Sequence, residues 1–190
     1  MLLIILTILS SFLANLEQRT FQSDFNVTVS EEVNAPLNYP GTITMHGRQF
    51  TLNMFGLEAA YDGQTLYLYN GDTDELTLSN PTEQELLEAN PFLFAKAVVD
   101  VCDVTEQPSA NGKETVITLT PKANEQMVQG KTVKKFVLKV RTSDLLPLSL
   151  EMREGKQTIT LRLQSPHFVT SDPKYVLEPE PSTFVNDMRF

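Results

Sequence analysis

Short runs of alternating apolar and polar residues recur along most of this chain, and they constrain its fold more than any other feature. The segment DFNVTVSEEV at 24–33 places Phe25, Val27 and Val29 on one side of an extended backbone. The same alternation occurs at 42–55, 115–121, 131–142, 146–152 and 156–164. Because successive side chains of a strand point to opposite faces, the pattern predicts antiparallel strands with one buried face. Turn residues at Gly47, Asn111-Gly112 and Glu154-Gly155 favour hairpins between neighbours.

One strand departs from this pattern. In YDGQTLYLYN, at 61–70, Leu66 and Leu68 point to one face, whereas Tyr67 and Tyr69 point to the other. A strand with one wet face would carry polar residues at every second position. We therefore expect an apolar part of the chain to cover the second face, or an apolar ligand to bind there.

The N-terminal sixteen residues, MLLIILTILSSFLANL, carry no charge and fit two interpretations. An uncharged apolar run is typical of a signal peptide, but no basic residue precedes it and no small-x-small cleavage site follows. The alternative is a helix of the mature protein, because Ile8, Phe12 and Leu16 fall on one helical stripe. We expect a helix that reaches at least Asn15, with residues 1–7 as a signal-peptide remnant at its head. The run is too short for a membrane span of about 20 residues.

The period changes to that of a helix within NPTEQELLEANPFLFAKAVVD at 80–100. Asn80 or Thr82 can cap a first helix, and Asn90-Pro91 ends it and begins a second. The last residues, at 171–190, are rich in proline and predict irregular structure with a final strand near Phe184 and Val185. No linker or repeat interrupts the chain, so residues 1–190 are expected to form a single domain.

Charge and composition exclude several functions. The net charge of −9 without a basic run argues against nucleic acid and against direct adhesion to an anionic membrane. The single cysteine, Cys102, cannot form an internal disulfide, and its apolar neighbours predict a buried thiol. Neither His46 nor His167 has acidic or nucleophilic residues at catalytic or metal-ligand spacing. We therefore expect no enzyme activity, no metal and no cofactor.

The side chains around the predicted helices can form either a solid core or an apolar cavity. The side chains of Met45, Met54 and Met127 are flexible and polarizable, which would let them adapt to an apolar ligand of irregular shape. Large apolar walls are available from four aromatic side chains, Phe50, Phe55, Phe92 and Phe94. Spacing alone does not separate the two alternatives.

Three segments that follow one another along the chain are DGQTLYLYN at 62–70, VITLTPKA at 116–123 and VKKFVLKV at 133–140. In this order they resemble the LolA family of periplasmic lipoprotein carriers, and they carry the resemblance most strongly. TFQSDFNVTV at 20–29, PGTITMHGRQFTLNM at 40–54 and NPFLFAKA at 90–97 agree with it, and together they extend the resemblance from about Ile8 to Arg189.

The resemblance implies an α+β fold that is mainly antiparallel β: an unclosed, half-open β-barrel with an N-terminal helix and short helices forming a lid over an apolar cavity. It implies a soluble, monomeric carrier in the periplasm of a Gram-negative bacterium. Such a carrier receives acylated lipoproteins or lipid from an inner-membrane ABC transporter and delivers them to an outer-membrane acceptor. The alternative is a lipid-binding or envelope-stress sensing module of the same fold.

The lid is expected within Pro81–Val99, and Arg48 corresponds to an arginine that would bond the carbonyl ends of a lid helix and latch it. The residues expected around the acyl chains are Met45, Arg48, Phe50, Leu52, Met54, Phe55, Tyr67, Tyr69, Leu86, Leu87, Phe92, Leu93 and Phe94.

Overall fold

The computed structural model describes residues 2–31, 35–122, 133–171 and 173–189, with the backbone alone for residues 2–7. Its described part contains three α-helices, one 3₁₀ turn and twelve strands. The helical elements are α1 (Leu2–Gln18), α2 (Glu83–Ala89), α3 (Pro91–Ala97) and η1 (Val99–Val101). The first six strands are β1 (Thr20–Glu31), β2 (Leu37–His46), β3 (Gln49–Met54), β4 (Leu57–Tyr61), β5 (Leu66–Asn70) and β6 (Glu75–Ser79). The others are β7 (Cys102–Pro108), β8 (Glu114–Pro121), β9 (Val133–Arg141), β10 (Pro147–Glu154), β11 (Gln157–Val169) and β12 (Phe184–Asp187).

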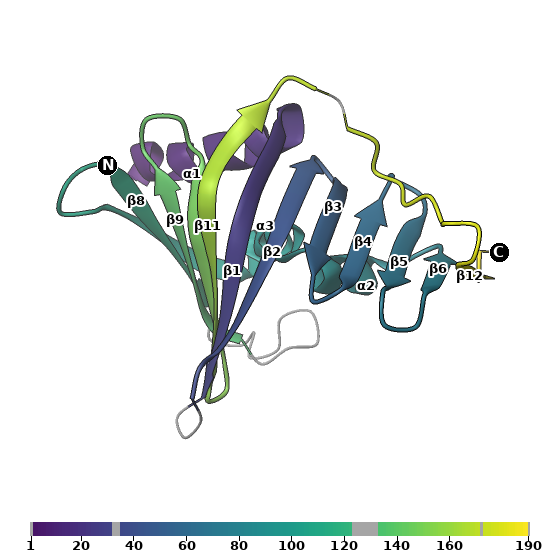
Figure 1. Cartoon of the computed structure of the whole chain (residues 1–190). Coiled ribbons are helices and arrows are strands. Elements are labelled where there is room, and N and C mark those ends of the chain that lie inside the picture. Colours follow the sequence, from purple (N-terminus) through teal and green to yellow (C-terminus); the bar gives the residue numbers. More distant parts are fainter. Residues whose placement is uncertain (1, 32–34, 123–132, 172, 190) are drawn as a thin grey trace.

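The described strands form one curved sheet in the order β12-β6-β5-β4-β3-β2-β1-β11-β10-β9-β8-β7. Neighbouring strands are antiparallel, except that β12 lies parallel to β6. The sheet bends strongly around β1 and β11, where the pairing shifts between Gln22 and Asp24 (Figure 1). Its two ends, β7 and β12, do not pair with each other in the described part of the chain. The predicted unclosed, mainly antiparallel half-barrel is therefore confirmed.

Gly41 permits a close approach inside this curved sheet. It lies opposite Phe25 on β1 and Met54 on β3. A Cβ atom at this position would lie 2.3 Å from Cζ of Phe25 and 2.5 Å from the carbonyl oxygen of Asn53. The absent side chain thus makes room for the Phe25 ring, which is buried in the core.

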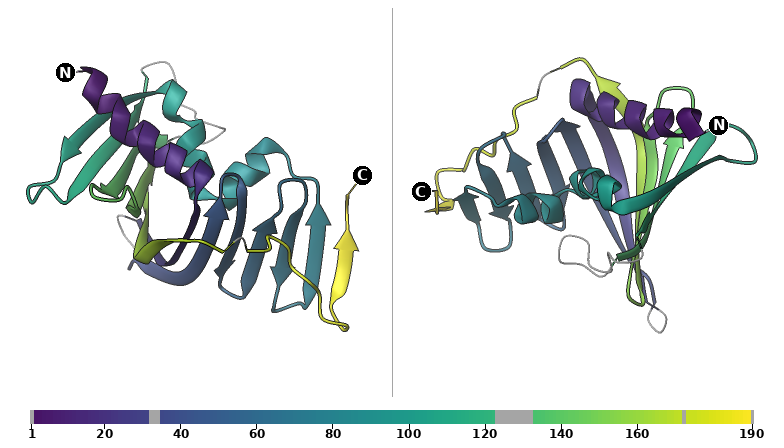
Figure 2. Two further views of the ribbon diagram at one scale, coloured as in Figure 1. Left: turned by 90° about the horizontal axis from the view of Figure 1, so that it is seen from above. Right: turned by 180° about the vertical axis from the view of Figure 1, so that it is seen from behind.

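Helix α1 packs across the concave side of the sheet, on the same side as α3 (Figure 2). Leu9, Phe12 and Leu16 are buried in the main core, so the predicted helical stripe is confirmed. The amide of Gly47 in the β2–β3 turn donates to the carbonyl oxygen of Leu16 over 2.7 Å, which ties this hairpin to the helix. No helix in the described part of the chain is both long and apolar enough to cross a bilayer.

The C-terminal tail covers the convex face of β4–β6, opposite α2 and α3 (Figures 1 and 2). Register places Tyr67, Tyr69, Leu76 and Leu78 together on this convex face. Leu76 and Leu78 are buried, and Tyr175 of the tail is only 4% exposed. The hydroxyl groups of Tyr69 and Thr183 both donate to Oδ1 of Asp74, which joins the strand and the tail. The second apolar face of the segment at 61–70 is thus covered by the tail.

We predict that Tyr175→Ala lowers the free energy of unfolding by about 2–4 kcal/mol, because it removes a large buried side chain that holds the tail to the sheet. Phe184→Ala is the matched control, since Phe184 lies in the same tail but is 65% exposed. The control should change stability by less than about 0.5 kcal/mol. Urea denaturation measures both variants, and equal effects would contradict the packing role of Tyr175.

Candidate functional site

Capping hydrogen bonds mark the ends of the short helices α2 and α3. Thr82 caps α2: its hydroxyl oxygen accepts from the Glu85 amide over 3.3 Å, and Oε2 of Glu85 accepts from the Thr82 amide over 2.7 Å. Asn90 ends α2 by donating its amide to the Leu86 carbonyl oxygen over 3.1 Å. It also begins α3, since its Oδ1 accepts from the Phe92 amide over 2.9 Å. Pro91 follows at the first position of α3, where its missing N–H costs no helical bond.

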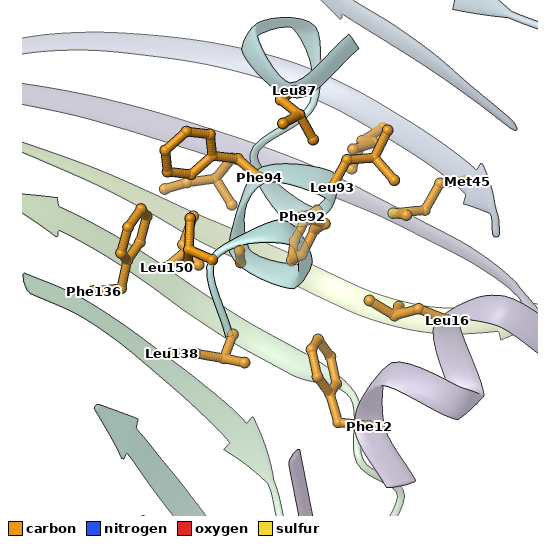
Figure 3. Close-up of a cluster of buried hydrophobic side chains, with 14 of the residues drawn as sticks. Phe12, Leu16, Met45, Leu87, Phe92, Leu93, Phe94, Phe136, Leu138 and Leu150 are labelled. Carbon is orange, nitrogen blue, oxygen red and sulfur yellow. The ribbon is translucent and has the colours of Figure 1, made fainter. Parts of the chain in front are cut away.

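The underside of this helix pair is buried in the hydrophobic core. Leu86, Leu87, Phe92, Leu93 and Phe94 are all buried against the concave face of the sheet (Figure 3). The Phe92 ring meets Phe21 of β1 edge-on, with the ring centroids 5.8 Å apart. The Phe94 ring lies 5.2 Å from that of Phe136 on β9. Helix α3 therefore packs against both β1 and β9.

Two hollows border α2 on the concave side. The smaller, of about 120 Å³, is almost wholly apolar and lies between the helix pair and strands β1, β9, β10 and β11. Its lining comprises Val27, Leu87, Glu88, Pro91, Phe94, Phe136, Leu150, Met152, Ile159 and Leu161. Sites for drug-sized ligands occupy about 300–1,000 Å³, so this hollow is too small to hold such a ligand without expanding.

The larger hollow is an open groove of about 400 Å³ over β3–β6. Its apolar floor includes Leu52, Met54, Leu57, Ala59 and Leu68, and Ala89 of α2 borders it. Leu57 is 50% exposed and Leu68 is 43% exposed, so this part of the concave face is open to water. Glu88 borders both hollows.

Two exposed ion pairs fasten the helix pair to its surroundings. Arg48 in the β2–β3 turn donates from Nη1 and Nη2 to the two carboxylate oxygens of Glu83, over 3.2 and 2.5 Å. Lys96 in the last turn of α3 pairs with Glu17 of α1. The hydrogen bond between Arg48 and Glu83 lowers the pKa of Glu83 and raises the pKa of Arg48. The pair therefore stabilises the packed position of α2 at neutral pH, and this contribution is lost as acid protonates Glu83.

Arg48 does contact α2, the helix expected to belong to the lid, but through a different group from the one expected. It binds a carboxylate in the first turn of α2, and not the carbonyl end of a helix. A bidentate guanidinium–carboxylate pair has defined geometry. Because both side chains are about half exposed, it contributes at most about 1 kcal/mol.

The other residues expected around the site lie in different parts of the structure. Met45 and Phe50 are fully buried beneath the helices, in the same core as the apolar residues of α2 and α3. Leu52 and Met54 line the open groove. Phe55 lies in the β3–β4 turn, where its ring packs on Tyr39, and it lines neither hollow. Met127 lies outside the described residues.

By register Tyr67 and Tyr69 belong to the convex face, and not to the face expected beneath the lid, although Tyr69 also borders the open groove. Strand alternation puts Leu66 and Leu68 of β5 on the concave side instead. The tyrosine hydroxyls serve local turns: Tyr67 donates to Asp62 over 3.2 Å and Tyr69 to Asp74 over 3.3 Å. The two apolar faces of β5 were predicted, but the face expected around the acyl chains is the one that the register places away from the helices.

Cys102 is buried, as predicted, and burial raises the pKa of its thiol. In the described part of the chain, no three His, Cys, Asp or Glu side chains converge as a metal site would require. His46 bonds to Thr20, and His167 bonds to the carbonyl oxygen of Ser165.

Comparisons with known proteins bear on the fold. Neither a protein-family model nor a curated protein sequence matches this chain. An uncharacterized conserved protein from Thermus thermophilus is similar in structure, with a TM-score of 0.63 and 12% identity over 95% of this chain and 97% of that one. The fold implied by the resemblance is confirmed.

Two further structures match more loosely. The Pseudomonas aeruginosa MucA/MucB complex gives a TM-score of 0.50 at 15% identity, over 88% of this chain and 58% of that one. A LolA superfamily protein from Nitrosomonas europaea gives 0.40 at 13% identity, over 86% and 94% of the two chains. At 15% identity, the similarity to the MucA/MucB structure concerns the fold and not the activity.

We predict that Arg48→Leu loosens α2 without unfolding the protein. Amide exchange in Glu83–Ala89 should accelerate about two- to fivefold, because one exposed ion pair of at most about 1 kcal/mol is lost. Hydrogen exchange followed by mass spectrometry measures this. Arg153→Leu, which removes an exposed pair with Glu151 on β10, is the control and should leave α2 unchanged. Unaltered exchange in α2 of the Arg48 variant would rule out the fastening role.

Proposed function

We propose that this chain binds the acyl chains of lipid or lipidated protein on its concave face, with α2 and α3 as a movable lid. The observation that carries the proposal is the open apolar groove beside α2, in which Leu57 and Leu68 remain exposed. A water-exposed apolar floor is costly, since each CH₂ group removed from water contributes about 0.8 kcal/mol. An acyl chain lying in the groove would cover this floor and shield its own methylene groups.

The lid can open because little besides apolar contact holds it closed. Helices of seven residues are marginal by themselves, so α2 and α3 depend on packing against the sheet. The two ion pairs are exposed and contribute about 1 kcal/mol or less each. An acyl chain that enters from the groove would replace the same apolar contacts, so opening and binding can occur together. The small hollow beneath Phe94 would then expand to admit the chain.

The finer form of the proposal is a soluble periplasmic carrier, acting as a monomer. It would take lipoproteins from an inner-membrane ABC transporter and pass them to an outer-membrane acceptor. The half-barrel fold and the ordered sequence motifs support this role. A carrier needs only binding and release, which agrees with the prediction that the protein is not an enzyme.

A lipid-responsive binding module is the second candidate. The match to the MucA/MucB complex favours it, because a chain of similar fold there is assembled with another protein. In such a module, a bound lipid would change the affinity for a partner protein. Mass spectrometry of the lipid that co-purifies with this chain separates the two roles: lipidated protein supports the carrier, and free phospholipid supports the module.

We predict that a fluorescent apolar probe binds the native protein at a ratio near one to one and is displaced by acyl chains. Leu68→Asn should weaken probe binding about fivefold, because about half of a leucine side chain is available for the probe to cover. Leu37→Asn is the matched control, since Leu37 is 54% exposed but does not line either hollow. A probe that binds only partly denatured protein, or equally to both variants, would contradict the proposed site.

A further inference from the structure

The polar groups that border the two concave hollows are neutral or acidic. Glu88 borders both hollows, and the polar residues that also border the groove are Glu58, Tyr69, Asn70, Glu75 and Thr77. Among the described residues that line these hollows, there is no lysine or arginine. An amphiphile with its tail on the apolar floor would therefore place its polar end near carboxylates.

Local structure accounts for the other acids of α2 but not for Glu88. Glu83 pairs with Arg48, and Glu85 forms the capping box with Thr82. Glu88 accepts only a 3.2 Å hydrogen bond from the neutral amide of Gln84 among the contacts of the described residues. It also lies near the C-terminal end of α2, where the helix dipole disfavours a negative charge. Its position therefore does not serve the stability of the helix.

Glu75, at the first position of β6, also borders the groove and also bonds to a neutral amide. Its contact is with the side-chain amide of Asn186 on β12, over 3.4 Å. No cation pairs with Glu75 in the part of the chain that the structure describes. The net charge of −9 adds to the negative potential at the groove.

We propose that the preferred ligand is an amphiphile with one apolar chain and a cationic polar end, such as an ammonium or a basic peptide segment joined to the chain. This inference rests on the proposed acyl-binding function and specifies its ligand class. The apolar chain lies on the floor of the groove, and the cation lies beside Glu88 and Glu75. An anionic head in the same position is repelled by both carboxylates.

Three amphiphiles with the same twelve-carbon chain test this preference: dodecyltrimethylammonium, laurate and dodecyl maltoside. Each displaces a bound apolar probe at pH 8, below its critical micelle concentration, while circular dichroism monitors the fold. The cation should bind about tenfold more tightly than the anion, with the uncharged maltoside between them, because exposed charge pairs contribute about 0.2–1 kcal/mol each. The difference should shrink as salt is added.

Glu88→Gln should reduce the ratio of cation to anion affinity about threefold, since the carboxylate that borders both hollows is neutralised. Asp103→Asn is the control: it makes the same change in net charge on an exposed residue of β7, at the opposite end of the sheet. The control should leave the ratio unchanged.

The outcomes separate this inference from the proposed function. Equal affinities, tighter binding of laurate, or an equal effect of the two variants would overturn the cationic preference while acyl binding stands. Failure of the probe and of all three amphiphiles to bind would overturn both.

Discussion

The apolar contact between α2–α3 and the concave face of the sheet is the interaction on which the rest of this structure depends. Seven-residue helices do not persist in water by their own hydrogen bonds. Their underside, with Phe92 and Phe94 as the largest members, is buried only because the sheet curves around it. The same curvature leaves the groove over β3–β6 outside the reach of the helices. One packing arrangement thus buries the helix pair and leaves the groove open beside it.

The two faces of the sheet are covered by different kinds of structure. The convex side of β4–β6 is covered by the tail, with Tyr175 buried and Tyr69 joined through Asp74 to Thr183. Because this cover is continuous in sequence with a β-strand, β12, it belongs to the sheet itself. The concave side carries separate helices whose exposed ion pairs are individually weak. Movement is therefore expected on the concave side and not on the convex side.

Sequence reasoning predicted those features that depend on local chemistry. The period-2 pattern predicted the strands, and the Thr82 cap and the break at Asn90-Pro91 predicted the two short helices. The stripe through Phe12 and Leu16 predicted the burial of α1. Each of these signals acts within a few residues, so a single sequence contains it.

The features that escaped prediction depend on partners far apart in the chain. Nothing around Tyr67 and Tyr69 shows that a tail more than a hundred residues later covers them. Arg48 was expected to bond helix carbonyls, whereas its partner is the side chain of Glu83. The groove residues Leu57 and Leu68 were missed because each has an ordinary strand context, and their exposure follows only from where α2 ends. Alternation predicts that a strand has two faces, but tertiary structure decides which face receives which cover.

The central claim, that α2 moves away from the sheet when an acyl chain binds, is tested most directly by a distance measurement. Spin labels are attached at Gln84→Cys and Lys139→Cys in a Cys102→Ala background, and pulsed electron paramagnetic resonance measures the distance between α2 and β9. Because Gln84 and Lys139 are both exposed, the labels need not disturb the core. With saturating dodecyl maltoside, below its critical micelle concentration, the distance distribution should shift to longer values and broaden. An unchanged distribution in protein that has demonstrably bound the amphiphile would contradict the account, because α2 would then be a fixed part of the core.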